Sequence, residues 1–123
     1  MRKNVCVFMN HPKYSDLFLG VSLKKDRNSF GLPGGKIEPA ENYWKAARRE
    51  CWEETGLRPS KLKKFYDDGL TITFYYSPSA LEIQKIENQP NEGCVGWITK
   101  DRLLNGPYGA YNAELFKKIK LEE

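Results

Sequence analysis

The sequence contains little of what zinc sites and disulfide frameworks require. It has one histidine and three cysteines, and Cys6, Cys51 and Cys94 lie far apart with no CxxC pair. Structural zinc sites need closely spaced cysteine and histidine ligands, and disulfide frameworks need paired cysteines. We therefore expect neither feature, and we expect the three thiols to be free.

The chain also lacks a long apolar segment. No run approaches the roughly 18 residues that a membrane span requires, and the opening MRKNVCVFMNHPK has too short an apolar stretch for a secretory signal. Repeats and linkers are missing as well. With 40% hydrophobic and 13% aromatic residues, the composition is that of one globular domain over residues 1–123. We expect a cytoplasmic protein without a membrane partner.

A concentrated basic patch is missing too. The formal charge of +4 comes from 20 Lys and Arg residues against 16 Asp and Glu, but the lysines are scattered in short runs. Nucleic-acid-binding domains carry a basic stripe, with aromatic residues where single strands are bound. We find no such stripe, so a nucleic-acid partner is not indicated.

Apolar runs and turn residues predict a mixture of strands and helices. Pro33 and the two glycines after it exclude a helix over 30–36, and we expect a short strand that runs into a shaped loop. The first two strands are expected to pair with each other across the turn HPKYSD. Strands outnumber helices, which favours an α/β or α+β fold with a mixed sheet between two helices. The predicted strands are 4–10, 17–24, 60–67, 70–77 and 93–99, and the predicted helices are 41–55 and 113–120.

Three glutamates gather on one side of the first predicted helix. Glu50, Glu53 and Glu54 occupy positions i, i+3 and i+4, so their carboxylates leave the helix within an arc of about 100°. Like charges at this spacing repel, and a bound divalent cation would offset the repulsion. Oxygen ligands without histidine or thiolate partners suit Mg²⁺ or Mn²⁺ better than zinc. The alternative is a solvated helix face, on which nearby basic side chains neutralise the glutamates.

The same helix has an apolar stripe. Trp44, Ala47 and Cys51 project from the arc next to the glutamates. We expect this stripe to pack on the sheet, which would put the acidic edge beside the core.

The residues around the glutamates follow a defined spacing. From Gly35 to Leu57, the segment GKIEPAENYWKAARRECWEETGL fits the pattern G-x5-E-x7-R-E-U-x-E-E-x-G-U, in which U is a bulky aliphatic residue. The one departure is Cys51 at the first U position, where a small buried hydrophobic residue should serve. Together with the flanking LPGG, this segment (residues 35–57) resembles the box of the Nudix hydrolase family. The resemblance implies an α/β/α sandwich over most of the chain.

The resemblance also implies roles for the matched residues. In Nudix enzymes the box holds Mg²⁺ against a diphosphate, and water attacks one phosphorus atom. Carried over, Glu50, Glu53 and Glu54 are the expected metal ligands and catalytic carboxylates, and no other cofactor is implied. Arg49 matches the arginine that orients the glutamates by ion pairing. Gly34 matches the position whose carbonyl oxygen ligates the metal, with a plain turn glycine as the alternative.

Family members often take a further carboxylate from a loop beyond the box, as a metal ligand or general base. Glu92, in NEGCVGW, precedes the strand tryptophan much as that residue does in MutT-type members. Glu87 is the rival, and a solvated loop acid is the alternative for either. Within the box, Glu41 is expected to anchor the loop.

The C-terminal YNAELFKKIK resembles the closing segment of MutT-type nucleoside triphosphate hydrolases. There, an asparagine just before the last helix recognises the base. Asn112 would take that role, because an amide offers both a donor and an acceptor. The alternative is that Asn112 caps the helix. Arg27 and Lys36 are the expected substrate contacts near the box.

Other family substrates have different markers. A proline at a set distance beyond the box tends to mark ADP-ribose hydrolases, and Ile72 and Thr73 stand there instead. A tyrosine slightly further on tends to accompany diadenosine polyphosphate hydrolases. Tyr75 matches that position, although a tyrosine in so aromatic a strand is more often a core or sheet-face residue.

We therefore expect a Mg²⁺-dependent Nudix pyrophosphohydrolase that cuts nucleoside triphosphates, with oxidised or other noncanonical dNTPs such as 8-oxo-dGTP among the candidates. Alternatives within the family are hydrolysis of diadenosine polyphosphates, RNA caps or nucleotide sugars. A further alternative is a non-catalytic Nudix module that binds a nucleotide. The expected partner is a small-molecule nucleotide, and both a monomer and a homodimer remain open.

Overall fold

The computed structural model describes residues 2–122, and their side chains up to residue 119. The strands are β1 (Asn4–Met9), β2 (Leu17–Ser22), β3 (Phe30–Gly31), β4 (Gly34–Lys36), β5 (Lys63–Asp67), β6 (Thr71–Tyr76) and β7 (Val95–Thr99). The helices are α1 (Tyr43–Thr55), the 3₁₀ turn η1 (Glu82–Lys85), α2 (Lys100–Leu104) and α3 (Gly109–Glu122). Within residues 2–122, no helix is both long and apolar enough to cross a membrane.

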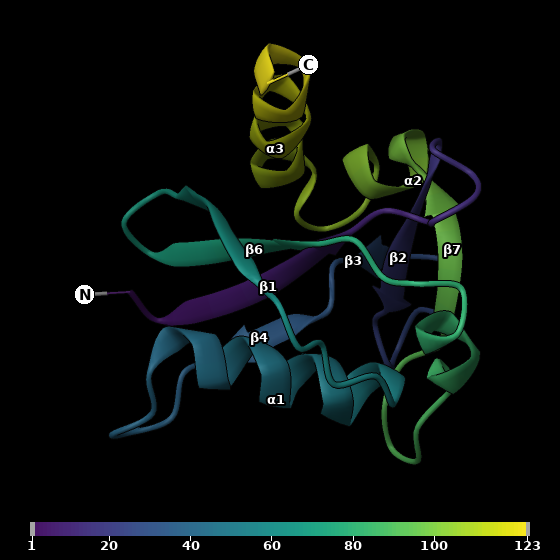
Figure 1. Ribbon diagram of the computed structural model, residues 1–123. Coiled ribbons are helices and arrows are strands. Elements are labelled where there is room, and N and C mark those ends of the chain that lie inside the picture. The colour runs from purple at the N-terminus through teal and green to yellow at the C-terminus, as the bar shows by residue number, and fades with distance from the viewer. Residues whose placement is uncertain (1, 123) are drawn as a thin grey trace.

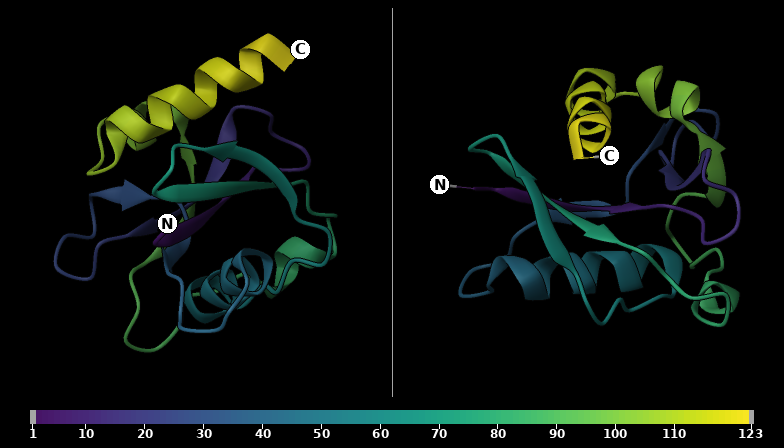
Figure 2. Two further views of the ribbon diagram at one scale, coloured as in Figure 1. Left: turned by 90° about the vertical axis from the view of Figure 1, so that its left-hand side faces the viewer. Right: turned by 45° about the horizontal axis from the view of Figure 1, so that its top comes forward.

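Two sheets lie at the centre of the molecule (Figure 1). The larger sheet has the strand order β4-β1-β6-β5 and is mixed, because β1 and β6 run parallel while the other pairs are antiparallel. The smaller sheet is antiparallel, with the order β3-β2-β7. Helix α1 covers one face of the larger sheet and α3 lies over the other, as the turned views in Figure 2 also show. The predicted sandwich of helices around a mixed sheet is confirmed.

The expected pairing of the first two strands is wrong. Both strands form where the apolar runs predicted them, but β1 belongs to the larger sheet and β2 to the smaller one. An isolated bridge between Asn10 and Phe18 links their ends. Strand β1 pairs instead with β4 and β6, where helices cover both of its faces. Its inner residues Val7 and Phe8, which point to opposite faces, are both fully buried.

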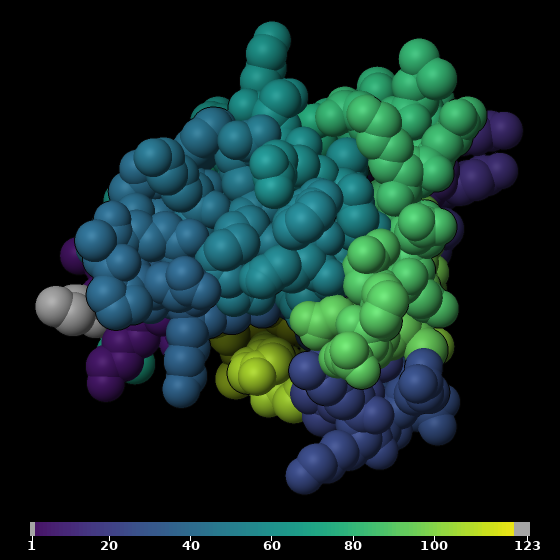
Figure 3. Space-filling view, turned by 90° about the horizontal axis from the view of Figure 1, so that it is seen from below, coloured from purple at the N-terminus to yellow at the C-terminus, as the bar shows by residue number. Residues whose placement is uncertain are grey.

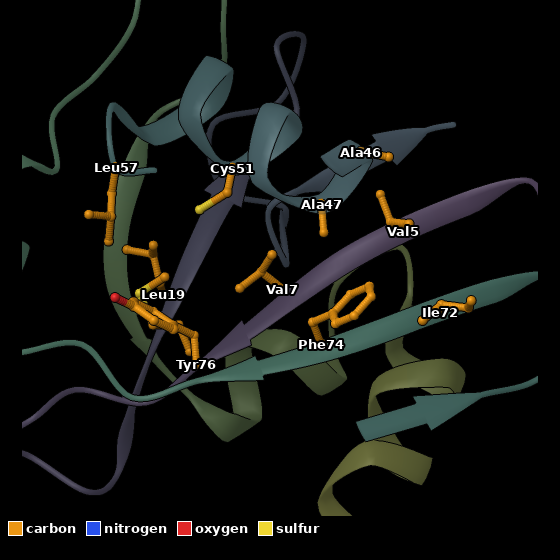
Figure 4. Packing of buried hydrophobic residues seen from close by; sticks show 11 residues of the cluster. Val5, Val7, Leu19, Ala46, Ala47, Cys51, Leu57, Ile72, Phe74 and Tyr76 are labelled. Atoms are coloured by element: carbon orange, nitrogen blue, oxygen red, sulfur yellow. The ribbon is translucent and has the colours of Figure 1, made fainter. Parts of the chain in front are cut away.

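The core between α1 and the larger sheet uses small residues on the helix side (Figure 4). Ala46, Ala47 and Cys51 have no exposed surface, which lets the helix backbone approach the sheet closely. The prediction that Trp44 belongs to this stripe is wrong. Its side chain is 37% exposed, and the guanidinium of Arg48 lies 4.7 Å from the centre of its ring. An indole is too large for so close a contact, and it lies on the outer side of α1.

The opposite face of the sheet packs against α3 through aromatic rings. Phe8 of β1 stacks on Phe18 of β2 at 5.2 Å between ring centres, and Phe116 of α3 meets both rings edge-on. Aromatic pairs in these geometries add to the stabilisation from buried area. This packing fixes α3 over the sheet.

Candidate active site

The amino-acid sequence sets both ends of α1, which carries the box glutamates. Asn42 is the N-cap, and its Oδ1 accepts a hydrogen bond from the backbone N–H of Lys45 at 2.8 Å. Gly56 ends the helix in the left-handed region at φ 82°, and its N–H donates to the carbonyl of Trp52. The helix between these caps presents the three glutamates from one rigid element.

Arg49 donates hydrogen bonds to three carboxylates and lies 3.6 Å from a fourth, that of Glu38. Its Nε and Nη2 donate to the two oxygens of Glu41 at 2.8 and 3.0 Å. Its Nη1 donates to Glu50 at 2.9 Å and to Glu53 at 2.8 Å. Nη2 also donates to the carbonyl of Lys36 at 3.0 Å, which ties the group to β4. These bonds raise the pKa of the guanidinium and hold the pKa of Glu41 below its usual value.

Glu54 reaches from α1 to the first residue of β4, just before the box. Its Oε1 accepts a hydrogen bond from the backbone N–H of Gly34 at 2.7 Å. Burial raises the pKa of Glu54 to about 8, the bond from Gly34 opposes the rise, and the charges of Glu50, Glu92 and Glu53 add to it. Burial also raises the pKa of Glu50. The two carboxylates are therefore costly to ionise while no cation is bound.

Two glycines let β4 lie against both α1 and β1. A Cβ on Gly35 would stand 2.6 Å from the carboxyl carbon of Glu50. A Cβ on Gly34 would collide with the carbonyl oxygen of Val5. Side chains at these positions would separate the loop from the glutamates or open the β1–β4 pair.

Of the two loop acids proposed from the sequence, Glu92 is the one whose charge reaches the box glutamates, where it raises the pKa of both Glu50 and Glu54. Its carboxylate is 23% exposed and lies 3.6 Å from Nζ of Lys24. Figure 3 shows the green segment around residue 90 against the indigo loop that follows β2. Glu87 is exposed, and its backbone N–H donates to the carbonyl of Thr55.

Arg27 and Lys36 come from different segments near the acidic cluster, which is defined here as Glu50, Glu53, Glu54 and Glu92. Nη1 of Arg27 contacts Sγ of Cys94, two residues beyond Glu92, so Arg27 lies on the loop side. Lys36 ends β4 with an exposed side chain, and its carbonyl is bonded to Arg49. A contact of either cation with phosphate stays a prediction.

The donor chemistry of the acidic cluster fits a hard divalent cation. Its side chains supply carboxylate oxygens, which Mg²⁺ and Mn²⁺ prefer. Burial, and to a smaller extent the repulsion between the carboxylates, raises the pKa values of Glu50 and Glu54, and a cation would offset both effects. Within the described part of the chain, no three acidic, histidine or cysteine side chains already stand close enough to hold an ion. Bonds from Arg49 and from the Gly34 amide hold the glutamates in their present positions.

A cavity of about 360 Å³ adjoins the box loop. Gly34 and Gly35 line one side, and the first turn of α3 and the turn between β5 and β6 line the others. This volume is in the range of small-molecule sites. A pocket of ligand size therefore lies directly beside β4, the strand that contacts Glu50 and Glu54.

Asn112 lines this cavity and is 2% exposed. It lies inside α3, with its backbone N–H bonded to the carbonyl of Tyr108, so the alternative that Asn112 caps the helix is wrong. The helix begins earlier than predicted, at Gly109. Nδ2 of Asn112 donates to the carbonyl of Leu103 at 3.3 Å. Beyond this bond, the amide can donate a second hydrogen bond and accept through its carbonyl oxygen.

Sequence reasoning missed most of this pocket. Cys6, Asp68 and Tyr111 line it from β1, from the β5–β6 turn and from α3. Neither spacing nor motif connects these three positions. Tyr108 also lines the pocket, and its place in the same segment as Asn112 was the one signal available.

Comparisons with known proteins agree with the fold and with the spacing of the box. A family model described as NUDIX domain matches residues 1–119. The chain therefore belongs to the Nudix hydrolase family, whose members generally use divalent metal ions.

Among curated proteins, an RNA pyrophosphohydrolase of Bradyrhizobium sp. (strain ORS 278) is 36% identical over 52 residues, which cover 42% of this chain and 31% of that protein. The match thus spans less than a third of the relative's length. Among solved structures, the NUDIX domain of Shewanella oneidensis NrtR complexed with ADP ribose has a TM-score of 0.73 at 17% identity, covering 99% of this chain and 88% of that one. An Ap4A hydrolase of C. elegans, solved as a binary complex, has a TM-score of 0.69 at 16% identity, covering 97% and 96%. At such identities the structural likeness shows the fold alone.

Proposed function

We propose that this protein is a Mg²⁺-dependent pyrophosphohydrolase that cleaves nucleoside triphosphates to a monophosphate and pyrophosphate. The observation that carries the proposal is the position of the cavity. It holds the buried amide of Asn112 at one side and Gly34 and Gly35 at the other, next to Glu50 and Glu54. If the base of a nucleotide is bound at Asn112, its phosphate chain can extend toward the acidic cluster.

Each group of residues has a separate role in the proposed hydrolysis. When bound, a divalent ion neutralises charge on the phosphates and lowers the pKa of the attacking water. Arg49 keeps the box carboxylates oriented. Arg27 and Lys36 attract the phosphate chain. A carboxylate of the acidic cluster accepts the proton of the attacking water, and Glu92, which comes from a separate loop, is the residue that we assign to this step.

Hydrolysis of the 5′ end of RNA is the second candidate. It is supported by the identity to the RNA pyrophosphohydrolase over 52 residues, and the cleaved phosphoanhydride is the same. Dinucleotide polyphosphates are less well supported. Tyr75, which matched the marker for their hydrolases, packs on Phe8 and lines a different cavity with Lys61 and Lys63.

The test is a phosphate-release assay with Mg²⁺ and coupled inorganic pyrophosphatase, run on each dNTP and on a 5′-triphosphorylated RNA oligonucleotide. Glu53→Gln should lower turnover by about 10²-fold or more, because it removes one of the charged ligands. Glu114→Gln, on the exposed side of α3, should retain wild-type turnover. In thermal denaturation, both variants should unfold cooperatively, as wild-type protein does. Full activity of Glu53→Gln would refute the proposal, and signal on RNA alone would establish the second candidate.

If wild-type protein is silent on all these substrates, calorimetry with nucleotides distinguishes a binding module from an enzyme with another substrate. Tight binding without Mg²⁺-dependent product over hours would identify the module. ADP ribose should be among the titrated ligands, because the Nudix domain of NrtR was solved in complex with it.

A further inference from the structure

Two tryptophans are exposed on the outer side of α1. Trp44 is 37% exposed and Trp52 is 47% exposed. Because they are eight residues apart on one helix, they project within an arc of about 80° and lie about 12 Å apart along its axis. Figure 3 views the molecule from the side of α1, whose surface appears in blue and teal. Large aromatic side chains exposed together on one face are typical of a contact surface.

A guanidinium lies beside each of these rings. That of Arg48 is 4.7 Å from the ring centre of Trp44, and that of Arg58 is 4.7 Å from the ring centre of Trp52. Nε of Arg48 also donates to the carbonyl of Pro59 at 2.7 Å. This bond ties the segment after α1 to the helix, so that both rings and both cations belong to one surface.

Two lysines extend this surface beyond Arg58. Lys61 and Lys63 line a second cavity of about 390 Å³, together with Tyr75 of β6. The segment 55–63 contains no Asp or Glu. Among the side chains that the structure describes, none forms an ion pair with these three cations. We define the α1 band as Trp44, Arg48, Trp52, Arg58, Lys61 and Lys63.

The nearby acidic side chains are turned away from the α1 band or engaged elsewhere. The glutamates of α1 lie about 120–200° around the helix from Arg48, where Arg49 and a backbone amide bind them. Glu82 also lines the second cavity, but its carboxylate accepts hydrogen bonds from the hydroxyl of Tyr76 and the backbone N–H of Ser79. The α1 band therefore complements a polyanion.

Single-stranded nucleic acid fits this combination of rings and cations. Its bases stack on exposed aromatic side chains and its phosphates pair with Arg and Lys, and neither contact depends on the base. In a duplex the base faces are already stacked on one another. A second copy of this chain fits poorly, because a two-fold contact would bring the cations of one band against those of the other.

We propose that the α1 band binds single-stranded nucleic acid, with bases stacked on its two tryptophans and phosphates paired with its cations. The sequence did not indicate such a stripe, because the turn after α1 is what brings the later cations beside the rings. The α1 band shares no residue with the acidic cluster, so the proposal does not depend on the proposed hydrolysis.

The experiment measures the binding of a fluorescent oligouridine with a 5′-hydroxyl end by anisotropy, in the presence of a chelator. Without a 5′ phosphate or a metal ion, this probe is no substrate for the acidic cluster. The logarithm of the affinity should fall with the logarithm of the salt concentration with a slope of about −3, because each of four cations contributes roughly −0.7. Tryptophan fluorescence should be quenched on binding, since bases stack on the rings.

Variants of the α1 band separate stacking from charge. Trp44→Ala and Trp52→Ala should each weaken binding about fivefold or more, which is the lower range for loss of one stacked base. Replacing both Lys61 and Lys63 by Gln should reduce the magnitude of the salt slope by about 1.4. All of these side chains are exposed or partly exposed, so the variants should unfold cooperatively, as wild-type protein does.

The matched controls lie elsewhere on the surface. Tyr14 is an exposed ring with the ammonium of Lys13 at 5.4 Å, in the turn between β1 and β2. Tyr14→Ala and Lys25→Gln should therefore bind the oligouridine as wild-type protein does. Absence of binding, or an equal loss in Tyr14→Ala and Trp52→Ala, would overturn the proposal.

Competition and sedimentation test the other occupants of the α1 band. An RNA duplex or polyglutamate that binds as tightly as oligouridine would show that stacking is not used, and would overturn the proposal. A dimer in analytical ultracentrifugation that Trp52→Ala dissociates would identify a second copy as the occupant and would also overturn it.

Discussion

Removing the charge of Glu54 should stabilise the metal-free protein at high pH and leave it unchanged at low pH. Burial raises the pKa of this carboxyl from 4.5 to about 8. The folded protein therefore binds more protons than the unfolded chain between these values. The free energy of unfolding should fall as the pH rises through this window and should level off above it.

The size of the effect follows from the same values. Each pKa unit corresponds to 1.36 kcal/mol, so the rise from 4.5 to about 8 corresponds to a loss of about 5 kcal/mol at most. Domains of this size unfold with a free energy of about 5–15 kcal/mol. The buried charge is therefore large enough to dominate the pH dependence of the metal-free protein.

Glu54→Gln is the suitable perturbation, because an amide oxygen can still accept the hydrogen bond from Gly34. Urea denaturation with a chelator should give similar free energies of unfolding for variant and wild type at pH 5. At pH 9 the variant should be more stable by up to about 5 kcal/mol. Added Mg²⁺ should raise the stability of wild type at pH 9 more than that of the variant.

The control is Glu114→Gln, whose half-exposed carboxylate on α3 should show no such pH-dependent gain. The reasoning would be refuted by equal stabilities of wild type and Glu54→Gln at pH 9, or by a difference of the same size at pH 5 and pH 9. Either result would mean that the ionised carboxylate is not penalised by its surroundings.

Two further predictions concern the frame of the site. Gly34→Ala should lower the free energy of unfolding by about 1–3 kcal/mol or more in urea denaturation, because its Cβ would meet the carbonyl of Val5, whereas Gly96→Ala has open space and should cost much less. Hydrogen bonds from Arg2 lower the pKa of Asp67 from 3.8 to about 2, so this pair stabilises the fold above about pH 4 and its contribution is lost as the pH falls toward 2. Asp67→Asn should therefore lower Tm at pH 7 and match wild type at pH 2, and an unchanged Tm at pH 7 would contradict the assignment.

Local signals in the sequence predicted the elements of the fold better than their arrangement. Strands β1, β2, β5, β6 and β7 all form within the predicted segments, and α1 ends at Gly56 as expected. Helix α2 was not predicted, because its five residues follow directly on β7 and have no separate periodic pattern. The expected pairing of β1 with β2 failed because burial of both faces of β1 favoured β6, a partner far along the chain.

The predicted site shows the same division. The spacing of Glu50, Glu53 and Glu54 predicted that they leave the helix on one side. There Arg49 bonds Glu50 and Glu53, and Glu54 bonds the backbone N–H of Gly34. By contrast, the sequence left Glu92 and Glu87 as alternatives. In the structure the charge of Glu92 acts on Glu50 and Glu54, whereas Glu87 contacts the end of the box through its backbone N–H, and a role for either carboxylate stays a prediction. Trp44 was assigned to the core by its helical position, whereas the close contact of α1 with the sheet admits only smaller residues.

By itself, the sequence determined the helix that bears the acidic residues, the two ends of that helix and the glycines beside it. These features depend on caps, on helical periodicity and on backbone freedom, which act between near neighbours in the chain. Only the tertiary structure decided that Cys6, Asp68, Tyr111 and Asn112 share one cavity beside those glutamates. Their proximity comes from the parallel pairing of β1 with β6 and from the aromatic packing that holds α3 over the sheet. Such long-range contacts depend on how the whole chain buries its apolar surface, which no local pattern encodes.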